Sequence, residues 1–149
     1  SLTKGEQRMQ ATFAAATYSD IGQSNAVNER KPEELITLLL QRACVAIKRS
    51  ILILQNDEMN SKDWEVRLKA TEEFNLSISK ALQIVTALRG VLDHQNGGEI
   101  ARQLHDTYTA IMASLWKSSK ERDTEELNKI LRAVTELKDA WEGVEGQPT

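Results

Sequence analysis

The side chains best suited to catalysis or metal binding are few in this sequence, and they are far apart. There is one cysteine, Cys44, and there are two histidines, His94 and His105. Neither histidine has the Glu-x-x-His spacing of di-metal helical bundles, and one cysteine with two histidines does not complete a usual structural zinc site. We therefore expect no metal site and no cofactor, with His94 in a loop and His105 exposed on a helix.

Other catalytic patterns are equally weak. Gly97-Gly98-Glu99 resembles half of a phosphate-binding loop, but such a loop needs Gly-Lys-Ser/Thr opening a helix after a strand. A turn at the entry to a helix is the simpler interpretation. No serine stands in a nucleophile-elbow pattern, and the carboxylates are mostly four residues from basic side chains, as on a solvated helix face. The sequence does not predict an enzyme.

Composition narrows the fold class. The chain has 149 residues, which suits one domain, with 40% hydrophobic and 28% charged residues. It contains only 7 glycines and 2 prolines, far fewer than the turns of an all-β domain require. We therefore expect an all-α protein.

Charge and hydropathy limit the partners. The net charge is −3 and no helix carries a basic stripe, so a nucleic-acid partner is not expected. No apolar run approaches the roughly 20 residues that a membrane span needs, so membrane insertion is not expected either. A single cysteine within an apolar run suits a buried thiol in a reducing compartment, and no secretion signal is visible. These features favour the cytoplasm.

Hydrophobic periodicity predicts four helices. Pro32 followed by two glutamates opens the first, which ends near Asn56. Ser61 is expected to cap the second, which ends near Gly90. The third is expected to begin around Glu99, with an apolar stripe formed by Ile100, Leu104, Tyr108, Ile111 and Leu115.

Asp123 and Glu126 form a plausible capping pair for the fourth helix, which we expect Gly143 to end. The breaks between helices are short, so successive helices should be antiparallel. The prediction is an antiparallel up-down four-helix bundle over residues 32–143. An N-terminal arm or short extra helix at 1–31 precedes it, and a tail at 144–149 follows.

The first helix has more apolar residues than one packed face can use. Its core stripe consists of Ile36, Leu39, Leu40, Ala43, Ile47, Ile51 and Leu54. Further apolar residues lie off that stripe: Leu35, Leu38, Val45, Leu52 and Ile53. Two explanations remain open from the pattern alone. The helix lies at the centre of the bundle, covered by its own chain, or it presents a groove to an amphipathic helix of a partner.

Tyr18, Ile21 and Val27 in the arm are spaced to lie along such a groove when no partner is bound. Ordinary packing of the arm on the bundle is the alternative.

Ordered motifs from about Tyr18 to Trp141 resemble one family. Tyr18 and Val27 precede Pro-Glu-Glu-Leu-Ile at 32–36, and Leu92-Asp93 precedes Gly-Gly-Glu-Ile-Ala at 97–101. The remaining matches are Leu38 to Leu40, Ala43, Leu104, Tyr108, Leu115, Asp123 and Asp139-Ala140-Trp141. In this order and spacing the chain resembles the FliS family of flagellin export chaperones. It departs from the family pattern at Lys31, Ala110, Ala113, Ser114 and residues 116–122.

The resemblance implies a cytoplasmic chaperone that binds the C-terminal segment of flagellin and prevents premature polymerisation before export. Export-gate or regulatory flagellar proteins are further candidate partners. As groove contacts we predict Leu35, Leu38, Val45 and Leu52, with Tyr108 and Trp116 as aromatic anchors. Tyr18, Ile21 and Val27 are predicted to cover part of the site when no client is bound. A helical adaptor or structural homodimer, which would bury the same leucines against a second copy, is the alternative.

Overall fold

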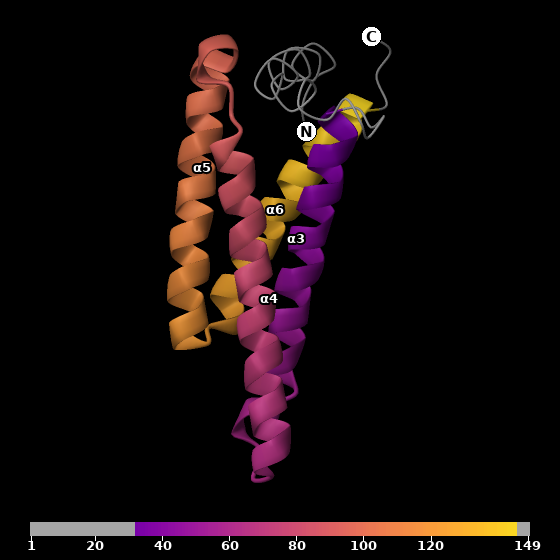
Figure 1. Ribbon diagram of the computed structural model, residues 1–149, viewed down its shortest axis with the longest axis vertical. Coiled ribbons are helices and arrows are strands. Elements are labelled where there is room, and N and C mark those ends of the chain that lie inside the picture. Colours follow the sequence, from indigo (N-terminus) through magenta and orange to yellow (C-terminus); the bar gives the residue numbers. More distant parts are fainter. Residues whose placement is uncertain (1–31, 146–149) are drawn as a thin grey trace.

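The structure is a computed structural model, and it describes residues 32–145. These residues form four long helices and one short 3₁₀ helix, with no strand among them. In chain order the elements are α3 (Pro32–Gln55), η1 (Glu58–Asn60), α4 (Trp64–Gly90), α5 (His94–Glu121) and α6 (Thr124–Glu145). Successive helices run in opposite directions (Figure 1). The predicted all-α, antiparallel four-helix fold is confirmed.

Helix α3 packs against both α4 and α6, while α5 packs mainly on α4. The four helices do not end at the same level. Figure 1 shows the C-terminal part of α3 and the N-terminal part of α4 extending well beyond the end of α5 and the start of α6. This end of the α3–α4 hairpin therefore lacks the cover that the other two helices give elsewhere.

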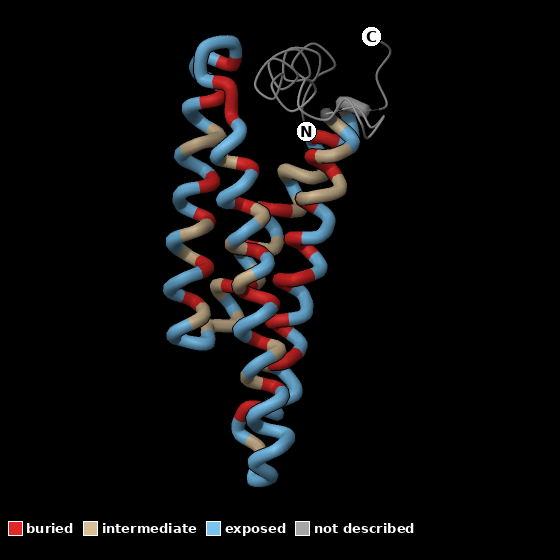
Figure 2. Tube along the Cα trace, in the orientation of Figure 1, coloured by how far each residue is buried: buried red, intermediate tan, exposed pale blue. Residues whose placement is uncertain are grey.

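The core is a continuous apolar cluster along the inner faces of the helices, visible in Figure 2 as the buried positions. Its largest fully enclosed side chains are Tyr108, Phe74, Ile36, Leu40, Ile47, Leu88, Leu115, Leu127, Val85 and Val134. The predicted core stripe of α3, from Ile36 to Leu54, is buried at five positions and partly buried at Leu39 and Leu54. Ile53, which lies off that stripe, is nevertheless only 4% exposed because α3 has neighbours on two sides.

Aspartate caps explain where three helices begin. Asp63 accepts a hydrogen bond from the Glu65 backbone N–H at 3.0 Å, and Asp123 accepts one from Glu126 N–H at 3.1 Å. The Asp123 cap was predicted. For α4 the prediction of Ser61 was wrong, since its hydroxyl instead accepts from the Asp63 backbone N–H. The α6 helix also passes through Gly143, which was expected to end it.

Helix α5 consists of two helical segments that meet at a kink at Gly98. The Asp93 carboxylate accepts from the backbone N–H groups of Gln95 and Asn96, both at 3.1 Å, so the helix starts at His94. The glycines that suggested a boundary lie inside it. Gly98 has φ 50° and ψ −125°, a backbone conformation that glycine adopts readily and other residues rarely do. A short segment that starts at His94 was therefore not predicted, whereas the longer segment begins after Gly98, around Glu99, as predicted.

Candidate protein-binding groove

Three apolar residues of α3 form a stripe on its outer face. Leu38, Val45 and Leu52 are spaced by seven residues, which is close to two helical turns. Val45 is 60% exposed and Leu52 is 50% exposed, while Leu38 is partly buried. We name these three residues the α3 stripe. Large apolar side chains exposed along one helix face are found at interaction sites.

The α3 stripe borders a groove of about 670 Å³ between α3 and α4. Its apolar lining consists of Leu38, Leu39, Val45, Ala46 and Ile84. Leu38 and Val45, two of the predicted contacts, thus lie together in one depression. Leu52 continues the stripe one heptad beyond the lining residues, and Leu35 is partly buried against the core without lining the groove.

The groove has basic side chains beside its apolar floor. Arg42, Arg49 and Lys80 all line it, from both helices. The Arg49 Nη2 donates to Glu73 Oε2 at 2.8 Å, which joins α3 to α4. A site of this composition suits an amphipathic helix that combines apolar residues with carboxylates.

These basic residues were not predicted as site residues. Arg42 follows Leu38 by four residues and Arg49 follows Val45 by four, a spacing that could have indicated one face of α3. Lys80 lies on α4 and lines the groove only because α4 packs on α3. This packing could not be predicted from the pattern of either helix alone.

The two predicted aromatic anchors lie in different environments. Tyr108 is 0% exposed and packs in the core with the other buried residues of α5, so in this conformation its ring presents no surface to a partner. Trp116 is 58% exposed, and Lys120 Nζ lies 4.7 Å from its ring centroid.

Trp116 follows Met112 and Thr109 by four and seven residues, and these contact Thr86 and Arg89 of α4. It thus lies on the α5 face directed toward α4, and it does not line the α3–α4 groove.

The chemistry-bearing residues do not assemble into a reactive centre. His94 is the first residue of α5 rather than a loop residue, and its ring lies 5.7 Å from that of His105, whose side chain is 43% exposed. Within residues 32–145 no three metal-binding side chains lie together. Cys44 is buried as predicted, with its Sγ 3.7 Å from the Thr135 hydroxyl of α6. No helix among the described residues combines the length and apolar character of a membrane span.

Tyr18, Ile21 and Val27 of the predicted arm lie outside the described residues. Their relation to the groove remains a prediction.

A four-helix bundle with a surface groove that combines apolar and basic side chains has the geometry of the helix-in-groove mode of protein recognition. Residues 14–148 match the model of the FliS family, described as flagellar protein FliS, and the chain belongs to this family.

Several curated relatives resemble most of the chain. The flagellar secretion chaperone FliSB of Pseudomonas aeruginosa is 26% identical over 91% of this chain and 98% of its own. The flagellar secretion chaperones FliS of Salmonella typhimurium and Escherichia coli are each 24% identical, over 85% and 89% of this chain and 86% and 90% of their own. These relatives are chaperones rather than enzymes, and the chain is a flagellar export chaperone by family.

Proposed function

We propose that this protein binds the C-terminal segment of flagellin in the cytoplasm and prevents its polymerisation before export. The observation that carries the proposal is the α3–α4 groove, with its apolar floor and its basic rim of Arg42, Arg49 and Lys80. A flagellin end that packs into helical bundles in a filament is an apolar amphipathic segment. Such a segment self-associates unless its apolar face is covered.

The mechanism follows from the same surfaces. The client forms a helix as it binds, placing its apolar side chains on Leu38 and Val45 and its carboxylates toward the basic rim. Ordering the client costs several kcal/mol, so a large contact area is needed for useful affinity. The same cost keeps the net affinity low enough for the client to be released at the export gate. The stripe continuing to Leu52 lengthens that contact along α3.

Tyr18, Ile21 and Val27 are proposed to occupy part of the site when no client is bound. Deleting residues 1–27 then changes client affinity while the helical circular-dichroism signal of the bundle persists. Loss of that signal would instead show that the segment belongs to the core.

The decisive experiment is titration calorimetry with a peptide covering about 40 C-terminal residues of flagellin from the same organism. We expect one-to-one binding with a negative heat-capacity change, and a gain of helix in the peptide. Val45→Asp places a charge in the groove and is expected to weaken binding at least about tenfold.

Val91→Asp is the matched control, because it makes the same change at a valine that is 39% exposed after α4, away from the groove. Equal affinity for the two variants would remove the groove from the proposal. No binding of flagellin peptides by the unaltered chain would favour the adaptor or homodimer, which sedimentation on dilution would then distinguish.

A further inference from the structure

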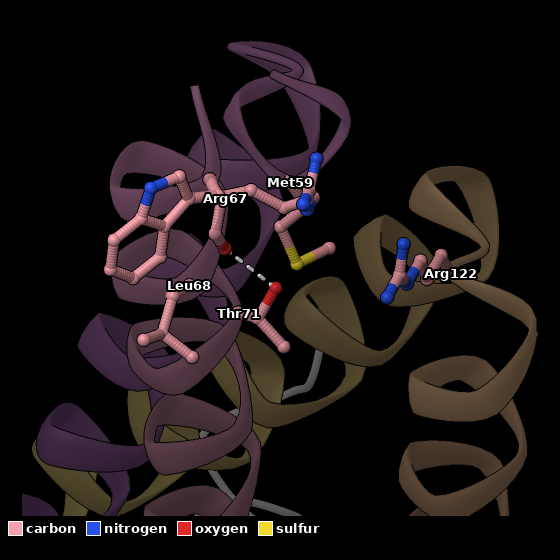
Figure 3. A pocket seen from close by; sticks show the side chains of 6 residues that line it. Met59, Arg67, Leu68, Thr71 and Arg122 are labelled. Atoms are coloured by element: carbon pink, nitrogen blue, oxygen red, sulfur yellow. Dashed lines mark hydrogen bonds between the residues drawn. The ribbon is translucent and has the colours of Figure 1, made fainter. Parts of the chain in front are cut away.

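A second apolar depression lies at the opposite end of α4 from the α4–α5 turn. It has a volume of about 450 Å³ and is lined by Met59, Trp64, Arg67, Leu68, Thr71 and Arg122. Figure 3 shows Met59, Leu68 and Thr71 beside Arg67, with Arg122 facing them from the ribbon that ends α5. We name this depression the distal cavity. None of its residues lines the α3–α4 groove.

The distal cavity continues the face of α4 that α5 covers. Thr86 contacts Met112 of α5 at 3.8 Å, and Arg89 donates to Thr109 of α5 at 3.1 Å. Eighteen residues make about five helical turns, so Leu68 lies on the same side of α4 as Thr86. By the same spacing, Thr71 lies on the same side as Arg89.

Helix α5 ends before it reaches this part of α4. Antiparallel helices advance in step, so the end of α5 at Glu121 is roughly level with Leu76. The α4 residues from Trp64 to Leu76 are therefore left without α5 over about 18 Å. Trp64 is 62% exposed and Leu68 is 50% exposed as a result. The open length accommodates about three turns of another helix.

Two guanidinium groups are the charged side chains that line the cavity, and Arg122 also lines an adjoining depression together with Asp57. Arg67 Nη1 donates to the Ser61 carbonyl at 3.0 Å, which holds this side chain near the hairpin end. Arg122 ends α5 in the left-handed region, with φ 52°. Neither guanidinium forms an ion pair with a carboxylate of residues 32–145. Two cations beside a tryptophan and a leucine complement a segment that carries both apolar and acidic side chains.

We propose that the distal cavity is a second protein-docking site, which binds an acidic amphipathic helix of a partner. The helix lies along α4 in line with α5, with its apolar side chains on Trp64 and Leu68 and its carboxylates directed at Arg67 and Arg122. This site is separate from the α3–α4 groove, so it can be occupied while that groove holds a client.

The test uses the full chain and a synthetic 18-residue amphipathic peptide, with leucines along one face and glutamates flanking them. Nuclear magnetic resonance follows the Trp64 indole N–H and the Met59 methyl group during titration. We expect saturable shifts of both signals. A matched peptide with lysine in place of every glutamate is expected to bind at least about tenfold more weakly.

Charge variants of the protein provide the second arm. Arg67→Glu with Arg122→Glu is expected to weaken binding of the acidic peptide at least about tenfold. Arg67→Lys with Arg122→Lys keeps both charges and is expected to bind within about threefold of the unaltered chain. Circular dichroism checks that both variants keep their helical content. Val45→Asp alters the α3–α4 groove, which by its composition can also take such a peptide, and is expected to leave the affinity measured from the Trp64 and Met59 signals unchanged.

Several results would overturn the proposal. These are no binding of the acidic peptide, equal binding of the two peptides, or shifts that Val45→Asp abolishes. Sedimentation of the unaltered chain tests whether a second copy of the chain, rather than an acidic partner, occupies the cavity. If the chain is a dimer that Leu68→Ser dissociates, a second copy covers the cavity and the acidic partner is excluded. Any of these outcomes leaves the flagellin proposal intact, because that proposal rests on the other groove.

Discussion

Arg49 of α3 donates through Nη2 to Glu73 Oε2 of α4, and the two atoms are 2.8 Å apart. Arg49 also lines the α3–α4 groove, so one side chain both joins the two helices and contributes charge to the site. The pair is solvated, with side-chain exposures of 56% for Arg49 and 36% for Glu73. The contribution of this ion pair to the free energy of unfolding and its contribution to binding affinity can be measured in separate experiments.

For stability we expect little from this ion pair. A double-mutant cycle with Arg49→Ala and Glu73→Ala should give a coupling free energy of about 0.2–1 kcal/mol, because water screens exposed charges. Urea denaturation at low and high salt measures it, and the coupling should shrink as salt rises. A coupling above about 2 kcal/mol would mean that the pair is less solvated than its exposure indicates.

For binding we expect Arg49 and Glu73 to behave oppositely. Arg49→Glu should weaken binding of the flagellin peptide, because it lowers the positive charge of the groove. The loss should appear mainly as a slower association rate at low salt. Glu73→Gln keeps the shape of the side chain and should leave affinity equal or higher, since it frees the guanidinium for the client's carboxylates. Surface plasmon resonance at two salt concentrations measures both. Parallel losses in the two variants would instead indicate that the ion pair holds the groove in shape.

Two glycines should respond to alanine with opposite signs. Gly98 has a positive φ of 50°, so Gly98→Ala should destabilise the bundle by about 1 kcal/mol although the space around it is open. Gly90 lies in the last turn of α4, also in open space, and Gly90→Ala should stabilise by about 0.4–1 kcal/mol. Thermal denaturation of both variants measures the difference. Stabilisation by both would mean that the kink in α5 is not required.

The Asp93 cap should contribute more than an ordinary surface residue. Asp93→Ala removes the acceptor for two backbone N–H groups at the start of α5 and should cost about 1–2 kcal/mol. Asp93→Asn keeps one oxygen acceptor and should retain most of the stability. Chemical denaturation measures both, and hydrogen exchange at Gln95 and Asn96 reports whether the loss is local. Equal losses for the two variants would mean that the negative charge, rather than the acceptor, stabilises this end.

Helix starts and exposed apolar residues could be predicted largely from the sequence alone. The helix start at Pro32 and the Asp123 cap were predicted correctly because such starts depend only on neighbouring residues. The short segment of α5 before Gly98 was not predicted, because the sequence signal of the two glycines is stronger than that of the Asp93 cap. In the site, the exposure of Val45 and Leu52 followed from their position off the core stripe.

The remaining features depend on contacts between helices. Ile53 is buried and Lys80 reaches the groove because α4 packs on one particular side of α3, and the periodicity of a single helix does not specify its neighbours. The distal cavity likewise arises from the relative levels at which α4 and α5 end, which follow from the register between the helices.

Tyr108 and Trp116 provide the final prediction, because both were expected to be aromatic anchors and the structure places them oppositely. Tyr108→Ala empties a fully enclosed site and should destabilise the bundle by about 3–5 kcal/mol. Trp116→Ala changes a side chain that is 58% exposed and should alter stability by less than about 0.5 kcal/mol. Denaturant titration separates these effects from binding, which is then measured only under conditions where each variant is folded. If folded Trp116→Ala binds the flagellin peptide as tightly as the unaltered chain, Trp116 is no anchor, and the α3 stripe with its basic rim is the smaller site that remains.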